Sequence, residues 1–387
     1  MNMKEEFKRS EERITDQEYH NLPENFEQAA DMVIKKGDDL MAANHGPEGL
    51  DPKTYHTPEN HIDRLQERAK EIADVFNLTR EQRKLLAIAI SYHDTIINYD
   101  APDEASIAGM VMRHRGAREG DKPMGEHGNE ALSAKMMLEA MERINQETGK
   151  TIFTADQMQI GQKAVDATYP GVELGPDFKG VEFIKDDLYE EIAAQNPRIA
   201  EMIAYLKENG ITKGLHFFQP HLENPLKQGE SMPEEVLIMS LVDLGAAGMV
   251  NNPEIFFEES DNEAKELYHN LRKSENIERL LNGDTSKDKE DRIKANGAML
   301  GWFHSQPGFM MWQMIRFEKI MKWLRENRQI DEEKEKGLHS IFAHYETNIQ
   351  AYTERDVRIK NEYDMLQSNQ GEKIAFAYLA GEMRLRG

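Results

Sequence analysis

The chain has no cysteine, which excludes disulfide bonds, cysteine nucleophiles and thiolate metal ligands. This composition suits a reducing compartment. Long apolar runs are also missing, and the most hydrophobic stretch, around Asp243, is far too short to cross a bilayer. Residues 1–8 contain no apolar segment of the kind found in secretion signals. We therefore expect a cytoplasmic protein without a membrane partner.

Positive charge is scarce, because 48 lysine and arginine residues stand against 71 aspartate and glutamate residues and give a formal net charge of −23. A surface this acidic repels anionic membranes and the backbone of nucleic acids. We therefore expect no nucleic-acid partner. A small anionic substrate is not excluded, because a metal ion and a few arginines can set the local field.

Strand-like alternation of polar and apolar residues is missing as well, and no internal repeat is visible. Apolar residues instead recur at the spacing of helix faces. Helix starts are indicated by a capping box of Thr79 with Gln82 and by a second box that opens at Ser231. The sequence therefore predicts an all-α fold.

Two separate sites in the sequence offer metal ligands. His61 precedes one predicted helix, and the adjacent pair His93 and Asp94 ends the next. They are far enough apart for two antiparallel helices with a short connection to bring them together. Neutral imidazole and carboxylate ligands together suit Zn, Mn, Fe, Co or Ni. We expect a divalent ion here, with Mg as a further candidate; such an ion acidifies a bound water and screens phosphate charge.

A fourth ligand must come from elsewhere in the chain, and Asp243 is the candidate. It lies in the most apolar part of a predicted helix, where an isolated carboxylate costs several kcal/mol unless it is paired or metal-bound. Two alternatives stay open. Asp243 can lie at a helix edge and face water or an arginine, or Asp166 can be the ligand in its place.

The chain thus carries these residues in order: His61, His93, Asp94 and Asp243. This order resembles the signature of the HD superfamily of metal-dependent phosphohydrolases, which is one His, an HD dipeptide and a distant Asp on a helical bundle. The flanking Tyr55-His56 and Asn129-Glu130 resemble a subgroup of predicted HD phosphohydrolases with an opening Tyr-His element. The resemblance covers residues 50–255 and, more weakly, later helices. It implies an HD-like helical bundle in which the four residues hold the metal.

The sequence departs from the family in three places. No histidine follows the Ala167-Thr168 pair, where the subgroup has one, and this weakens a two-metal interpretation. Asp243 lies farther from Asp94 than a minimal HD bundle needs, which implies an insertion, placed at residues 170–230. The glutamate pair that follows the HD dipeptide in (p)ppGpp hydrolases is absent, which argues against alarmone hydrolysis.

Three residues are candidates for the chemistry. Asp94 is expected to help orient the attacking water. Glu130 is either a base, as the resemblance implies, or a first-turn carboxylate that the helix dipole favours. His56 is expected to line the pocket as an acid for the leaving oxygen rather than to bind the metal. Pro58 argues against one continuous helix through His56 and His61, so both rings need not point the same way.

One locally basic stretch, residues 113–122, interrupts the acidic chain. Arg113 and Arg115 in this stretch are predicted to bind the phosphate oxygens of a substrate, because the guanidinium fork matches their geometry. The alternative is a solvated loop without a role in binding.

These patterns divide the chain into three parts. Residues 1–50 are expected to form an N-terminal helical segment, and residues 51–255 the HD-type metal-binding domain. Residues 256–387 are expected to form a helical extension that packs on the bundle or joins subunits of a homo-oligomer. Within it, the strongly charged stretch 258–296 predicts exposed helices. We predict a metal-dependent phosphohydrolase for a small phosphate ester or nucleotide; the alternative is a metal-binding or ligand-sensing HD protein without turnover.

Overall fold

Helices make up most of the regular structure in the computed structural model, which describes residues 22–99, 106–111, 128–169, 171–172, 181–182, 192–214 and 217–385. The strands within these ranges are two residues long and pair antiparallel: β1 (Gly171–Val172) with β4 (Phe217–Phe218), and β2 (Val181–Glu182) with β3 (Lys213–Gly214). The predicted all-α fold is therefore confirmed. Within the described ranges, no helix combines the length and the apolar character that a bilayer crossing requires.

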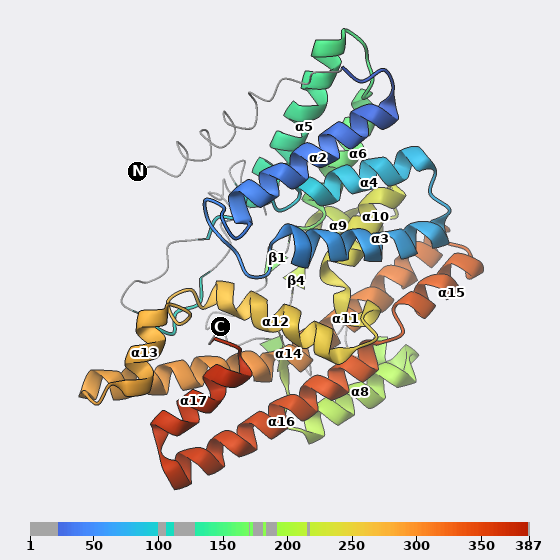
Figure 1. Cartoon of the computed structure of the whole chain (residues 1–387). Coiled ribbons are helices and arrows are strands. Elements are labelled where there is room, and N and C mark those ends of the chain that lie inside the picture. The colour runs from blue at the N-terminus through green and yellow to red at the C-terminus, as the bar shows by residue number, and fades with distance from the viewer. Residues whose placement is uncertain are drawn as a thin grey trace.

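The upper part of Figure 1 is a bundle of helices from the first two thirds of the chain. Its members are α2 (Phe26–His45), α3 (Asp63–Phe76), α4 (Arg80–Tyr92), α5 (Asn129–Thr148), α6 (Ala155–Asp166) and α10 (Glu234–Leu244). A short π-helical turn, η1 (Pro58–Ile62), leads directly into α3. Because α10 packs against α3, α4 and α6, segments far apart in the sequence meet inside this bundle.

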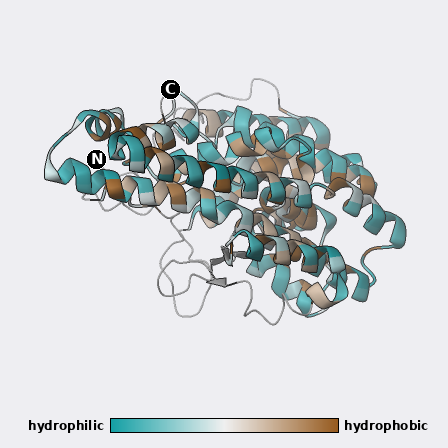
Figure 2. Cartoon of the chain, turned by 90° about the horizontal axis from the view of Figure 1, so that it is seen from below, coloured by the Kyte–Doolittle hydropathy of each residue, from teal (hydrophilic) through white to brown (hydrophobic). Residues whose placement is uncertain are grey.

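The later helices lie mostly in the lower part of Figure 1. The remaining described helices are α8 (Pro197–Glu208), α9 (Pro220–Lys227), α11 (Ala246–Met249), α12 (Pro253–Leu267), α13 (Ser274–Asn282), α14 (Ser286–Glu326), α15 (Glu332–Ile341), α16 (Tyr345–Gln370) and α17 (Glu372–Glu382). One core joins both parts, because Leu65 of α3, Ile238 of α10 and Ile315 of α14 belong to the same buried cluster. Figure 2 shows hydrophobic residues gathered mainly on the inward sides of the helices.

Helix α12 lies between the two parts (Figure 1) and binds both. Its Glu259 accepts from Arg64 Nη1 at 2.7 Å and from Arg68 Nη2 at 2.6 Å, both on α3. Its Asp261 accepts from Arg355 Nη2 of α16 at 2.9 Å. The sequence predicts exposed helices over residues 258–296. For α12 this expectation is wrong, because Glu259 and Asp261 are buried. Each carboxylate has a guanidinium partner on a neighbouring helix, which replaces the water that a lone charge needs.

The predicted helix starts are partly confirmed. Thr79 and Gln82 form the expected capping box at the start of α4. The box predicted for Ser231 with Glu234 is wrong, because α10 begins at Glu234 with Pro233 as its N-cap residue and without a side-chain cap. Proline has no side-chain acceptor, so α10 begins without a side-chain cap.

Candidate metal centre

Three segments of the upper bundle bring the predicted ligands together. His61 lies in η1, directly before α3. His93 is the C-terminal cap residue of α4, so Asp94 follows the helix at once. Asp243 lies in the last turn of α10, which packs on α3 and α4. The ends of these elements therefore meet at one place.

The donor atoms of His61, His93 and Asp94 form a compact triangle. His61 Nε2 lies 3.1 Å from His93 Nε2 and 3.2 Å from Asp94 Oδ2, and the third side, His93 Nε2 to Asp94 Oδ2, is 3.1 Å. Ligand atoms about 2.1 Å from one ion are about 3.0 Å apart in an octahedron and about 3.4 Å apart in a tetrahedron. The triangle therefore has the size of one face of a coordination shell.

Asp243 adds a fourth donor to this group. Its Oδ1 lies 3.8 Å from His61 Nε2 and 3.7 Å from His93 Nε2, and these three residues could hold a metal ion. The side chains of His61, His93 and Asp94 are at most 4% exposed, and that of Asp243 is 12% exposed. All four predicted ligands thus share one nearly dry site.

The local contacts leave ring nitrogens of both histidines available to a metal. His93 Nδ1 lies 2.8 Å from the carbonyl oxygen of Ile90. A carbonyl only accepts, so Nδ1 carries the proton and Nε2 presents a lone pair. Burial lowers the pKa of His61 to about 3, which keeps that ring neutral. Burial also acts to lower the pKa of His93, but the carboxylates of Asp94 and Asp243 outweigh it and raise the pKa. The same negative field attracts a metal cation.

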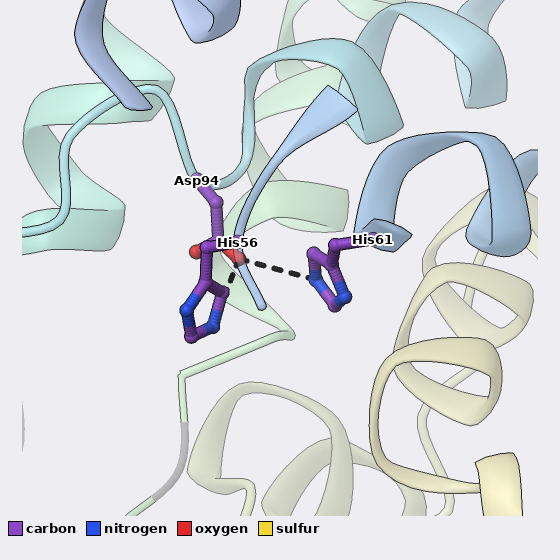
Figure 3. A group of neighbouring side chains, drawn as sticks. All are labelled: His56, His61 and Asp94. Carbon is purple, nitrogen blue, oxygen red and sulfur yellow. Dashed lines mark ion pairs between the residues drawn. The ribbon is translucent and has the colours of Figure 1, made fainter. Parts of the chain in front are cut away.

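His56 lies beside these ligands. Its Nε2 is 3.7 Å from Asp94 Oδ2, and its ring centroid is 5.2 Å from that of His61. Figure 3 shows the Asp94 carboxylate facing both rings. His56, His61 and Asp94 also form a group that could hold an ion, although His56 is farther from Asp94 than the other two histidines are. His56 Nε2 thus lies as far from Asp94 Oδ2 as Asp243 Oδ1 lies from His93 Nε2, 3.7 Å in both cases, so His56 is a further donor beside the four predicted ligands.

Glu266 of α12, which the sequence reasoning missed, holds His56 from behind. Its Oε2 accepts from His56 Nδ1 at 2.6 Å and from the Tyr99 hydroxyl at 2.9 Å. Its Oε1 accepts from the backbone N–H groups of Thr54, Tyr55 and His56. Burial acts to raise the pKa of Glu266, but His56 and these N–H donors outweigh it and hold the pKa well below its usual range.

Glu130 and Asp166 form a separate acidic pair. Neither Glu130 nor Asp166 belongs to a group of described residues that could hold an ion. The acid that accompanies the histidines is therefore Asp243 and not Asp166. Glu130 is buried in the first turn of α5. Burial, followed by repulsion from Glu130, raises the pKa of Asp166 to about 7. The start of α5 is tied to the loop after the ligands, because Ser133 Oγ accepts from the Ile96 N–H at 3.1 Å.

The predicted substrate-binding residues Arg113 and Arg115 lie outside the described residues. Arg316 of α14 is a buried cation near the centre that the sequence reasoning also missed. Its Nη2 donates to Ser240 Oγ at 2.7 Å, one turn before Asp243. Burial lowers the pKa of Arg316, and Asp243 is among the groups that oppose this. A guanidinium group thus lies within electrostatic reach of the ligand group.

Comparisons with known proteins add no assignment, because no family model, curated protein or solved structure matches the chain. The chemistry of the site must therefore be inferred from its donors. Two imidazoles and two carboxylates, gathered in one nearly dry site, suit a divalent transition metal.

Proposed function

We propose that the chain is a metal-dependent phosphohydrolase of the HD type that acts on a small phosphate ester or nucleotide. One observation carries the proposal: donors of His61, His93 and Asp94 form a triangle with sides of 3.1 to 3.2 Å, beside Asp243. The order of these residues and their helical setting resemble the HD signature. A cytoplasmic location is part of the proposal, because the chain has no cysteine.

The four ligands of this site are proposed to hold one divalent ion: His61, His93, Asp94 and Asp243. Such an ion supplies Lewis acidity and lowers the pKa of a bound water toward neutrality. A set of imidazoles and carboxylates without thiolates is compatible with Mn, Mg, Zn, Ni, Co or Fe.

The chain's own residues are proposed to orient the water, to protonate the leaving oxygen and to bind the phosphate. The Asp94 carboxylate orients the attacking water by accepting a hydrogen bond from it. His56 donates a proton to the leaving oxygen, and Glu130 stays a candidate base. Arg113 and Arg115 are proposed to bind the phosphate oxygens. Because the ligands are almost fully buried, bulk water is excluded and these electrostatic interactions are strong.

The alternative is a metal-binding or ligand-sensing protein without turnover. Structural metal sites are closed by protein ligands and need no proton donor beside them. Here the His56 ring, backed by Glu266, lies 3.7 Å from a ligand oxygen. This paired histidine next to the ligands favours an enzyme over a structural site.

Metal analysis combined with a phosphatase screen tests the proposal. The purified chain is expected to carry a divalent ion and to hydrolyse phosphomonoesters or nucleotides in the presence of that metal. Chelation is expected to abolish the activity, and the added metal to restore it. Bound metal without turnover on any of these substrates would favour the sensing alternative, and a chain that binds no divalent metal would contradict both.

A further inference from the structure

We propose that Glu266 is a positioning residue of the active centre, which holds His56 with Nε2 turned toward the metal ligands. This role rests on the phosphohydrolase function proposed above. It makes α12, which follows all the ligand-bearing segments in the sequence, part of the catalytic apparatus. His56 touches the substrate, and Glu266 acts through His56.

Both oxygens of Glu266 are fully used. Oε1 accepts from the N–H groups of Thr54 at 2.8 Å, Tyr55 at 2.6 Å and His56 at 3.0 Å. Oε2 accepts from His56 Nδ1 and from the hydroxyl of Tyr99. A carboxylate offers about four lone-pair sites, so these donors saturate it. The side chain is 1% exposed, and it fixes both the backbone and the ring of His56 to α12.

The contact between Glu266 and His56 decides which ring atom meets the substrate. An ionised carboxylate only accepts, so the proton between the two residues belongs to His56 Nδ1. The other nitrogen, Nε2, then faces Asp94 Oδ2 at 3.7 Å. This distance is too long for a direct hydrogen bond, so His56 stands beside the ligands without being held by them. To act as an acid the ring must carry a second proton, on Nε2. It gives that proton to the leaving oxygen and returns to the neutral tautomer with Nδ1–H held by Glu266.

Glu259 provides a matched control on the same helix, about two turns earlier. It is also a buried glutamate, but its partners are the guanidinium groups of Arg64 and Arg68 rather than a histidine. Replacing Glu259 is therefore expected to lower stability without changing how activity depends on the leaving group.

The test uses the metal-loaded full chain with phenyl phosphate and 4-nitrophenyl phosphate. Phenolate leaves poorly unless it is protonated, whereas 4-nitrophenolate needs little protonation. In E266Q one terminal oxygen becomes an NH2 group, which cannot accept from His56 Nδ1 and Tyr99. Since general acids contribute roughly 10²- to 10⁴-fold, we expect E266Q to lower kcat/KM about 100-fold for phenyl phosphate and less than about 5-fold for 4-nitrophenyl phosphate. Metal content should not change.

Two further variants show whether Glu266 acts through His56. H56A is expected to give the same selective loss, and the double variant E266Q/H56A is expected to be no slower than H56A, because the two residues work as a unit. E259Q is expected to affect both substrates equally.

Equal losses on both substrates, or no loss, in folded E266Q would overturn this role. If E266Q does not fold, Tyr99→Phe decides, because it removes one donor and leaves the carboxylate in place. A selective loss of a few-fold on phenyl phosphate in Tyr99→Phe supports the role, and an equal effect or none overturns it. A wild-type chain that hydrolyses neither aryl phosphate, nor any phosphomonoester or nucleotide of the screen above, overturns the phosphohydrolase function, and the role of Glu266 with it.

Discussion

Buried acids receive different partners in two regions of the molecule. Between α12 and α16, Asp261 accepts from Arg355 at 2.9 Å, so the chain itself supplies the positive charge. At the metal centre, Asp94 faces the imidazoles of His61 and His93 at 3.2 and 3.1 Å, and imidazoles act as metal ligands in their neutral form. The first region is balanced by its own residues, whereas the second is suited to a cation from outside.

This contrast separates a contribution to folding from a contribution to function. A buried ion pair is costly to break, because the remaining charge stays in a dry place. A group of ligands behaves differently, because metal binding adds free energy only when the ion arrives. A substitution at the metal centre is therefore expected to abolish metal binding and leave the chain folded. A substitution in the Asp261–Arg355 pair is expected to lower stability and leave metal binding intact.

The largest effect is expected for Asp94→Ala. The change removes one corner of the donor triangle, so the chain should lose its bound metal and with it the hydrolysis of phosphate esters, by at least about 1000-fold. The chain is expected to stay folded, since the apolar residues of the core are untouched. Elemental analysis, phosphatase assays and circular dichroism check these three points, with the exposed Asp74→Ala of α3 as a control. An unchanged hydrolysis rate would remove Asp94 from the reaction.

Asp261→Ala is expected to lower the stability of the chain and to leave its metal binding unchanged. It leaves the Arg355 guanidinium buried between the rings of Phe257 and Phe303, whose centroids lie 4.7 and 4.9 Å away. Such a loss typically costs about 3–5 kcal/mol, while the folded fraction should keep its metal. Urea unfolding gives the free energy, and elemental analysis gives the metal content. A variant that lost metal but kept its stability would break the contrast between the two regions.

Metal addition is expected to have a smaller effect on stability. A ligand at about 100 times its Kd stabilises the folded state by about 2.7 kcal/mol. Thermal unfolding with and without the divalent ion should show this shift in the wild type and in Asp261→Ala, but not in Asp94→Ala. The same shift in all three chains would place the bound ion elsewhere in the molecule.

The convergence of the candidate ligands was open to prediction from the sequence because their signal is local. His61 precedes a helix with clear apolar periodicity, and His93 with Asp94 ends a helix whose capping box is visible at Thr79. Asp243 was accessible for a related reason, since a carboxylate in an apolar run needs a partner. The all-α fold followed from the same periodicity.

The contacts of Glu266 could not be predicted from the local sequence, because its partners are remote along the chain. His56 lies 210 positions away along the chain, and α12 itself contains so many charged residues that the pattern indicates exposure. Whether Glu259 and Glu266 are buried depends on Arg64, Arg68 and His56, which other elements supply. Charge patterning along one helix cannot reveal a partner that tertiary packing brings to it.

The last effect concerns a third way to accommodate an acid inside the fold, which is to keep its proton. Burial and the charge of Glu130 raise the pKa of Asp166 from 3.8 to about 7. The folded chain therefore binds this proton more tightly than the unfolded chain does. Its contribution to stability is fully present below about pH 4 and is lost as the pH rises through about 7.

Asp166→Asn, which resembles the neutral acid, should remove this dependence. Between about pH 4 and pH 7, the wild type should lose up to about 1.4 kcal/mol of stability per pH unit relative to the variant, and the difference should level off above that range. Urea unfolding in metal-free buffer at several pH values measures it, with Asp156→Asn, an exposed change on the same helix, as the control. If the curves of wild type and Asp166→Asn run parallel, Asp166 ionises in the folded chain as it does in the unfolded one. The proposed retention of a proton by the Glu130–Asp166 pair would then be contradicted.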